Sequence, residues 1–331
     1  MFIRISMCNF TFSPASSIII TNARAAPISD RNGVPKLMKY FEKHPMLLLA
    51  VGILGLSMSA VLVRYSDAPS AVTAAFRMFW TVLLMSPMFL FSSRYRKELS
   101  GVSRKTFLLC IASGICLALH FIIWFDSLKY TSVASATAIV CTEVVWVSLG
   151  YCLVLKGKLQ PKAVLAIAVT LAGSVLIAWS DSGSGGGHLH GDILALFAAV
   201  AVAVYTLIGR AARAAISTTV YTYLVYVAAA AALAAIALLQ GYSLAGYGRN
   251  AVVTGFLLAL FSTILGHSIC SWCLKYISPA FVSASKLCEP VIAAVLAFFL
   301  FQEVPKIAQI AGGAVIIGGV LFYSRIEHNQ P

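Results

Sequence analysis

The sequence predicts an all-α membrane protein with ten transmembrane helices in two inverted five-helix repeats. Its composition, the length of its apolar segments and an internal repeat support this fold class. Apolar residues make up 60% of the 331 residues and charged residues only 11%, whereas about a quarter of a soluble domain is charged. So few charges cannot cover a soluble surface, and lipid must therefore be the solvent for most of the chain.

Ten apolar segments have about the length of one bilayer crossing, which takes roughly 20 helical residues. They must be helical, because a lone strand in hydrocarbon would leave its backbone groups unpaired. Short polar breaks separate them, such as 66–69 after the first and 94–97 after the second, and the shortest break is 275–279. In chain order the expected spans are 45–64, 71–92, 105–127, 131–155, 161–180, 191–213, 219–240, 251–275, 279–301 and 306–324.

An internal repeat relates the two halves of the chain. Leu128-Lys129-Tyr130 returns 146 residues later as Leu274-Lys275-Tyr276, and at this offset eight of eighteen positions in 128–145 match 274–291. Glu143 recurs as Glu289. Because each copy holds five helices, an odd number, the copies must have opposite orientations. Inverted repeats of this kind place a substrate site near the midplane, where the halves meet.

The repeat divides the chain into five parts. We expect an N-terminal tail at 1–44, a first repeat at 45–180, an outer linker at 181–191, a second repeat at 192–324 and a cytoplasmic tail at 325–331. The first part contains prolines and polar interruptions, so we interpret it as a disordered tail, or as an extension upstream of a start near Met38, and not as a signal peptide.

The distribution of basic residues predicts the orientation. With the N-terminus inside, eighteen Lys and Arg fall in cytoplasmic loops and tails. Only Arg64, Lys129, Arg249 and Lys306 fall outside. By the positive-inside rule both termini are cytoplasmic, and we expect the protein in a bacterial inner (plasma) membrane. The net charge of +13 does not indicate a nucleic-acid partner, because the charges are scattered over short loops.

Signatures of enzymes and cofactors are absent. The chain has no Gly-rich nucleotide-binding loop followed by Lys-Ser/Thr, no His-Glu-x-x-His and no Gly-x-Ser-x-Gly, so we expect neither catalysis nor a cofactor. His188 and His190 near Asp192 lie in a glycine-rich loop that is better explained by solvation than by a metal. Cys270-x-x-Cys273 lies in an apolar span, where cysteines pack as small hydrophobes.

A few polar residues lie inside the predicted spans. A charge at mid-bilayer costs on the order of 3 kcal/mol, so each should face protein or a water-filled cavity. Lys286 and Glu289 are three residues apart and would share a helix face. They could neutralise each other, Lys286 could pair with Glu143, or the three could line a pore for binding or gating. The complete set is Arg77, His120, Glu143, His267, Lys286 and Glu289.

Each of the other candidate site residues has two possible roles. Arg77 could bind a carboxylate or phosphate, or pair with Asp67 or Asp126. His120 and His267 are weaker candidates, which more often pack than relay protons. Trp146, three residues after Glu143, and Tyr205 could stack on a substrate or simply pack between helices. Trp124 and Trp272 lie near span ends and fit an interfacial belt.

Small residues suggest close helix contacts. Gly312-Gly313 and Gly318-Gly319 in the last span, and the alanines 228–232 in the seventh, would let neighbouring backbones approach. They concern the assembly of the bundle, and they also permit an oligomer.

Five segments of the chain are informative as a set. One is the arginine-bearing stretch Thr73-Ala74-Ala75-Phe76-Arg77-Met78-Phe79-Trp80. The others are Leu287-Cys288-Glu289-Pro290, Phe301-Gln302-Glu303, Gln309-Ile310-Ala311-Gly312-Gly313 and Gly318-Gly319-Val320. Together these segments resemble the EamA-type members of the drug/metabolite transporter superfamily, and the resemblance covers about 45–324. The resemblance implies two inverted five-helix halves around a central cavity, alternating access and small-metabolite cargo, often amino acids moving outward. The first repeat departs from the pattern, with Val144 at the position of Pro290 and Gly157 at that of Glu303.

We therefore expect a secondary transporter of a small-molecule substrate in the lipid bilayer, and specifically an exporter of amino acids or related metabolites. An uptake or exchange carrier for a nucleotide-like or adenosyl-containing metabolite is the alternative. A non-transporting scaffold or receptor subunit is a remote one, because nearly every loop is shorter than about a dozen residues. The acids and histidines permit proton coupling without requiring it.

Overall fold

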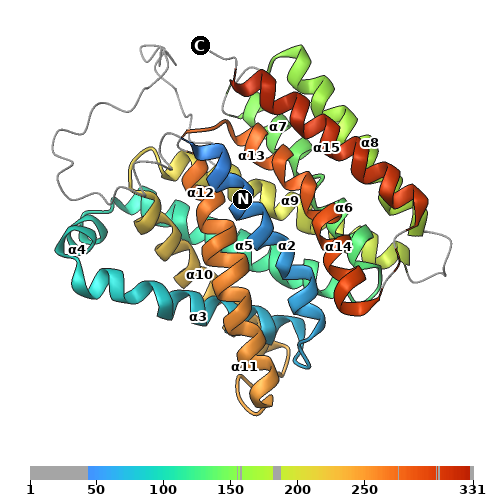
Figure 1. Cartoon of the computed structure of the whole chain (residues 1–331). Coiled ribbons are helices and arrows are strands. Elements are labelled where there is room, and N and C mark those ends of the chain that lie inside the picture. The colour runs from blue at the N-terminus through green and yellow to red at the C-terminus, as the bar shows by residue number, and fades with distance from the viewer. Residues whose placement is uncertain are drawn as a thin grey trace, which may run out of the picture. The chain divides into compact units, whose positions relative to one another are not determined.

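The structure is a computed structural model that describes residues 44–154, 156, 159–181, 188–274, 276–302, 304 and 306–328. The described residues form helices and short connections, without strands (Figure 1). The N-terminal tail, most of the 181–191 linker, Gly157, Lys275 and Glu303 lie outside them, so the expectations for these parts concern undescribed residues.

The apolar spans expected from the sequence are helical. Eight described segments are long and apolar enough to cross a membrane, and the shorter apolar helices Pro161–Ile177 and Ile307–Tyr323 match the two remaining expected spans. The number of ten crossings and the inverted orientation of the repeats remain predictions. Seven of the expected spans form continuous helices, namely α2 (Pro45–Arg64), α3 (Ser70–Phe91), α5 (Arg104–Ser127), α8 (Pro161–Asp181), α9 (His188–Ala212), α10 (Thr218–Leu239) and α15 (Ile307–His328).

The fourth and ninth spans are interrupted, and the eighth stays helical throughout but includes a π-helical segment. The sequence did not predict these features, because apolar residues continue on both sides of them. The fourth forms α6 (Val133–Val140) and α7 (Glu143–Leu153), and the ninth forms α13 (Pro279–Ser285), the 3₁₀ turn η3 (Lys286–Cys288) and α14 (Glu289–Phe301). The eighth forms α11 (Gly248–Leu257), the π-helix η2 (Leu258–Ser268) and α12 (Ile269–Cys273).

The breaks in the fourth and ninth spans occupy equivalent positions of the sequence repeat. Each lies directly before the repeated glutamate, which becomes the first residue of α7 in one half and of α14 in the other. The repeat also places a serine at the start of both spans. The Ser132 hydroxyl accepts the Ser135 amide, and the Ser278 hydroxyl accepts the Phe281 amide. Matching residues therefore begin and interrupt these spans in both halves, although Val144 replaces Pro290.

A short helix after α3 was also not expected. α4 (Ser93–Ser100) carries the charged segment that follows the second span, and it buries none of its residues. The Glu98 carboxylate accepts the backbone amide of Ser217, the residue that precedes α10. A carboxylate at a helix N-terminus is favourable, so α4 attaches the loop to the start of α10.

Small residues bring helix pairs close together, as the sequence predicted. α8 and α15 lie side by side (Figure 1), and a Cβ added to Gly312 would lie 2.7 Å from the Gly173 carbonyl oxygen. A Cβ added to Gly114 in α5 would lie 2.6 Å from the Ala228 Cβ in α10. Gly318 has no such neighbour within 4 Å. Backbone contact at Gly173 and Gly312 therefore holds α8 against α15.

Candidate functional site

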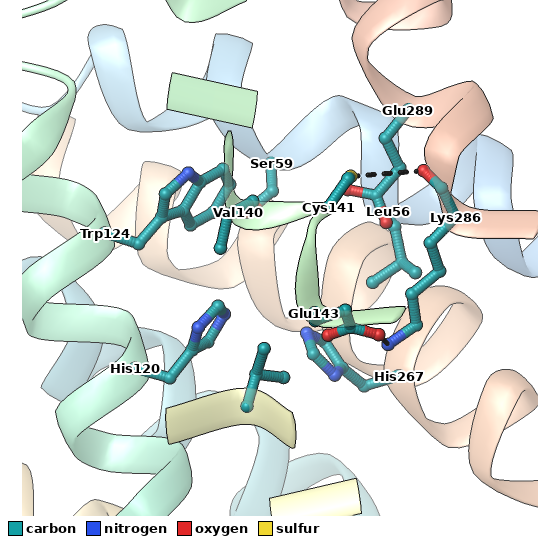
Figure 2. Close-up of a pocket in the computed structure, with 11 residues that line it drawn as sticks. Leu56, Ser59, His120, Trp124, Val140, Cys141, Glu143, His267, Lys286 and Glu289 are labelled. Atoms are coloured by element: carbon teal, nitrogen blue, oxygen red, sulfur yellow. Dashed lines mark hydrogen bonds and ion pairs between the residues drawn. The ribbon is translucent and has the colours of Figure 1, made fainter. Parts of the chain in front are cut away.

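A small cavity lies where the broken helices meet (Figure 2). Its volume is ≈ 30 Å³, enough for about two water molecules. Side chains from both halves of the chain surround it, and they include two carboxylates, an ammonium and two imidazoles. The lining residues are Leu56, Ser59, His120, Trp124, Val140, Cys141, Glu143, Val202, His267, Lys286 and Glu289.

An ion pair joins the two halves in this cavity. The Lys286 ammonium, in η3, donates to a Glu143 carboxylate oxygen, at the start of α7, over 2.8 Å. The two side chains are only 9% and 4% exposed. Of the two pairings considered from the sequence, the one across the repeats is therefore present. Each charge compensates the other in a site with little water, where either one alone would be costly.

The break in the ninth span exposes a backbone carbonyl to the other half. Pro290 has no N–H, so it cannot donate to the Lys286 carbonyl oxygen as the helix would require. The Glu289 amide, one residue earlier, donates to this oxygen, and the Cys141 thiol donates to it as well, over 3.2 Å. Figure 2 shows this contact beside the ion pair, so backbone and side chain of Lys286 both contact the first half.

The Glu289 carboxylate has no ion pair or hydrogen bond to any described residue. It is 8% exposed and lines the cavity beside the Lys286–Glu143 pair. As the first residue of α14 it lies at the positive end of a helix, which favours a carboxylate. Thus the site contains one paired and one unpaired carboxylate, and the unpaired one faces the cavity.

Aromatic rings form another wall of the cavity. The His120 ring in α5 lies parallel to Trp124, with centroids 6.0 Å apart. Its Nδ1–H donates to the Ala198 carbonyl oxygen over 2.9 Å, which fixes the ring. Since Nδ1 carries the proton in this arrangement, Nε2 is an acceptor. The His267 ring, from η2, lies 6.5 Å from His120 and has no hydrogen bond to a described residue.

Arg77 lies next to this cavity without lining it. Its Nε donates to Thr263 over 2.8 Å, its Nη1 donates to Ser59 over 3.1 Å, and its guanidinium lies 4.1 Å from the Phe121 ring centroid. Its Nη2 has no hydrogen-bond partner among the described residues. The pairing with Asp67 or Asp126 considered from the sequence does not occur among the described residues, because Arg77 is buried between helices. Asp126 pairs with Lys129 instead.

The structure separates the remaining candidates from the cavity. Trp146 is partly buried one turn along α7 from Glu143 and does not line the cavity. Tyr205 is buried near it, with its hydroxyl 3.3 Å from that of Ser271 and its ring 6.3 Å from His267. In this conformation Trp146 and Tyr205 therefore pack between helices.

Sequence reasoning missed several lining residues. Trp124, assigned to an interfacial belt, is buried and lines the cavity, and its indole N–H has no hydrogen-bond partner in the described part of the chain. Ser59 and Cys141 also line it. The sequence did contain a signal that Cys141 lies near the site, since this residue precedes the repeated glutamate by two positions. It contained no such signal for Ser59, because small hydroxyl residues are common in membrane spans.

No group of three or more metal-ligating side chains occurs among the described residues. His190 contacts the Tyr130 ring, with centroids 4.8 Å apart. Cys270 and Cys273 are both buried and free. The carboxylates of the central cavity lie beside an ammonium and two imidazoles.

Comparisons with known proteins agree with this arrangement. The EamA-like transporter family matches the chain twice, at residues 44–179 and 189–325. A relative described as an uncharacterized transporter of Archaeoglobus fulgidus is 23% identical over 256 residues, 76% of this chain and 87% of the relative. Another so described, of Clostridium kluyveri, is 24% identical over 249 residues, 73% of this chain and 79% of the relative. A solved crystal structure superposes with a TM-score of 0.70 at 18% identity, covering 86% of this chain and 98% of that one, so the two folds are alike.

Proposed function

Because the chain belongs to the EamA-like transporter family, an integral membrane family of transporters, we propose that it exports a small zwitterionic or amphipathic metabolite by alternating access. Amino acids and related compounds are the proposed cargo. The proposed orientation has both termini in the cytoplasm of a bacterial cell, with the chain in the inner membrane.

The proposal is based on the charged side chains of the central cavity. A zwitterion needs a cation for its carboxylate and an anion for its ammonium, and both are present on facing elements. The Glu289 carboxylate has no ion pair or hydrogen bond within the described residues and is therefore available to an ammonium. Lys286 can exchange Glu143 for the carboxylate of the cargo, because its ammonium has three N–H groups and the pair lies at the cavity wall. The Trp124 ring and N–H offer an apolar face and a donor at the same cavity.

The size of the cavity supports alternating access. A volume of ≈ 30 Å³ holds water but not an amino acid, and pockets for small ligands are usually about 300 Å³ or larger. The conformation described is therefore contracted, and the cargo requires movement of the elements around the site. The breaks in the fourth and ninth spans are natural places for this movement, since interrupted helices lack some of the backbone hydrogen bonds that make a helix stiff.

The experiment that tests the function is efflux from proteoliposomes. The full-length protein would be reconstituted, loaded with a defined mixture of amino acids, nucleosides and nucleotides, and diluted into cargo-free buffer without ATP. We expect amino acids to leave faster than from protein-free liposomes. Efflux confined to adenosyl-containing or nucleotide-like compounds would favour the alternative carrier, and no efflux of any compound would favour a non-transporting protein.

The energy source and the assembly state are part of the same proposal. Without a nucleotide-binding loop in the sequence, a gradient or exchange must supply the energy. Efflux measured with and without an imposed pH gradient tests proton coupling through the cavity acids. Light scattering of the purified protein tests whether the small-residue faces form an oligomer.

A further inference from the structure

A second cavity lies at the surface of the bundle, where α6 packs against both α8 and α9 (Figure 1). Its volume is ≈ 250 Å³, and it shares no lining residue with the central cavity. We refer to it as the lateral cavity. Its lining residues are Ala138, Ile139, Thr142, Ser174, Val175, Trp179 and Asp192.

The mouth of the lateral cavity faces lipid. Its two exposed lining side chains, Val175 and Trp179 of α8, are apolar and 57% and 75% exposed. In an integral membrane protein, lipid covers such exposed apolar surface. Trp179 lies two residues before the end of α8, and Asp192 lies four residues after the start of α9. The mouth is therefore close to the helix ends, at the level where lipid headgroups meet the hydrocarbon.

The carboxylate of Asp192 lacks a partner in this cavity. Its Oδ1 is buried and accepts no hydrogen bond from a described residue, and Asp192 forms no ion pair with one. Gly191 packs this part of α9 tightly, because a Cβ at Gly191 would lie 2.9 Å from the Thr131 amide nitrogen in the turn after α5. A buried carboxylate oxygen without a donor is costly, so the site favours a ligand that supplies one.

Two hydroxyls provide further acceptors. Ser174 is 1% exposed, and its hydroxyl has no hydrogen-bond partner in the described part of the chain. The Thr142 hydroxyl donates to the Ile139 carbonyl oxygen over 2.7 Å, and its own oxygen can still accept. None of the lining residues is basic. The polar side of the lateral cavity therefore consists of oxygen acceptors, one of them charged, which suit the three N–H groups of a primary ammonium.

The lining favours an organic ammonium over a metal cation. Hard cations such as Mg²⁺ and Ca²⁺ take about six to eight oxygen ligands, more than Asp192, Ser174 and Thr142 offer. The remaining lining side chains are apolar. The carbon atoms of an organic ammonium can contact these side chains while its N–H groups reach the acceptors.

Residues at the break in the fourth span line both cavities. Ile139 and Thr142 line the lateral cavity, whereas Cys141 and Glu143 line the central one. A ligand in the lateral cavity therefore contacts the segment that positions Glu143, the carboxylate of the central ion pair.

We propose that the lateral cavity binds the primary ammonium of a phospholipid headgroup, that of phosphatidylethanolamine, with the Asp192 carboxylate as its counter-charge. The acyl chains remain in the bilayer. The inference goes beyond the proposed function, because the lipid is a bound partner and not the cargo. The ammonium of a zwitterionic cargo is the other source of the same group. The lipid-facing mouth favours the phospholipid, and the experiments below separate the two sources.

The test is native mass spectrometry of the full-length protein in detergent. The protein is titrated with an equimolar mixture of phosphatidylethanolamine and phosphatidylcholine that have identical acyl chains. Both headgroups carry a cationic nitrogen, but only ethanolamine has N–H groups to donate. We expect the first lipid retained to be phosphatidylethanolamine over phosphatidylcholine by about tenfold. A ratio near one, or a preference for phosphatidylcholine, overturns the proposal.

An acid variant and its control identify the counter-charge. Asp192→Asn, which keeps the size of the side chain, should lower the ratio to about one. Asp126→Asn is the matched control, because Asp126 is 36% exposed, is paired with Lys129 and does not line the cavity, and this variant should keep the preference. An undiminished preference in Asp192→Asn, or an equal loss in both variants, overturns the assignment to this site.

A second pair of variants tests the location with the carboxylate intact. Val175→Trp should fill the mouth and abolish the preference. Val164→Trp, on the same helix with a similar exposure of 51% and outside the lining, should keep it. Equal ratios in these two variants would place the lipid elsewhere and overturn the proposal, whether or not Asp192→Asn folds.

Competition identifies the source of the ammonium. A mixture of the twenty amino acids should leave phosphatidylethanolamine bound, and its displacement would overturn the lipid in favour of cargo. Preferential retention of phosphatidylglycerol, which has no ammonium, would overturn recognition of that group. Since no transport is measured, either result leaves the proposed function standing, and a failure of efflux leaves the lipid ratio unaffected.

Discussion

Replacing Lys286 with methionine tests the energetic role of the ion pair that joins the two halves. The pair is separated by 2.8 Å, and at an effective dielectric constant near 20 two such charges attract by about 6 kcal/mol. Desolvation of both groups offsets much of this attraction. Removing one partner leaves Glu143 buried and uncompensated, which costs about 3–5 kcal/mol. A chain of 331 residues loses about 1.5 °C per kcal/mol, so the unfolding midpoint should fall by about 4–7 °C.

The assay is thermal unfolding of the purified full-length protein in detergent, followed by tryptophan fluorescence. Lys129→Met is the matched control, because its pair with Asp126 has the same length of 2.8 Å but the side chains are 52% and 36% exposed. An exposed pair contributes about 0–1 kcal/mol, so that midpoint should fall by no more than about 1.5 °C. The double variant Lys286→Met, Glu143→Leu should recover much of the loss. If Lys286→Met and Lys129→Met unfold at the same temperature, the reasoning is wrong.

Three further predictions concern transport, packing and orientation. Glu289→Gln should lower efflux at least about tenfold with normal membrane insertion, because an unpaired carboxylate in the cavity is available to the cargo; normal efflux would mean that the charge is dispensable. Gly312→Leu should lower the unfolding midpoint by an overpacking cost of about 1–3 kcal/mol at the α8–α15 contact, and Gly318→Leu, with open space around it, should not; equal midpoints would argue against this contact. In intact cells an impermeant maleimide should label a single cysteine at position 185 and not one at 97, and the reverse pattern would invert the assigned topology.

Composition and periodicity sufficed to predict the spans, because the hydrophobic requirement of the bilayer core extends over a whole helix. They did not predict the breaks in the fourth and ninth spans, since apolar residues continue on both sides of each break. At the ninth span Pro290 gave a signal, because its missing N–H interrupts the helical hydrogen bonds. At the fourth span Val144 gave none, although the chain breaks there as well.

The central ion pair shows the same difference between sequence and structure. Spacing along a continuous helix placed Lys286 on one face with Glu289, yet η3 interrupts that helix and Lys286 reaches Glu143 in the other half. The sequence repeat pointed to Glu143 as a possible partner of Lys286, but it gave no distance between the two side chains. Trp124 was misjudged for a related reason, because a position near a span end does not tell whether the ring faces lipid or protein.

Counterflow in proteoliposomes tests most directly the central claim that the charged cavity carries the cargo. Liposomes containing the full-length protein and loaded with unlabelled amino acids would be placed in a trace of the labelled compounds, without ATP. We expect transient accumulation of label with the wild-type protein, and at least about tenfold less with Lys286→Met, Glu143→Leu protein that elutes and unfolds as a folded monodisperse species. Undiminished accumulation with that variant, or none with the wild-type protein, would contradict the account.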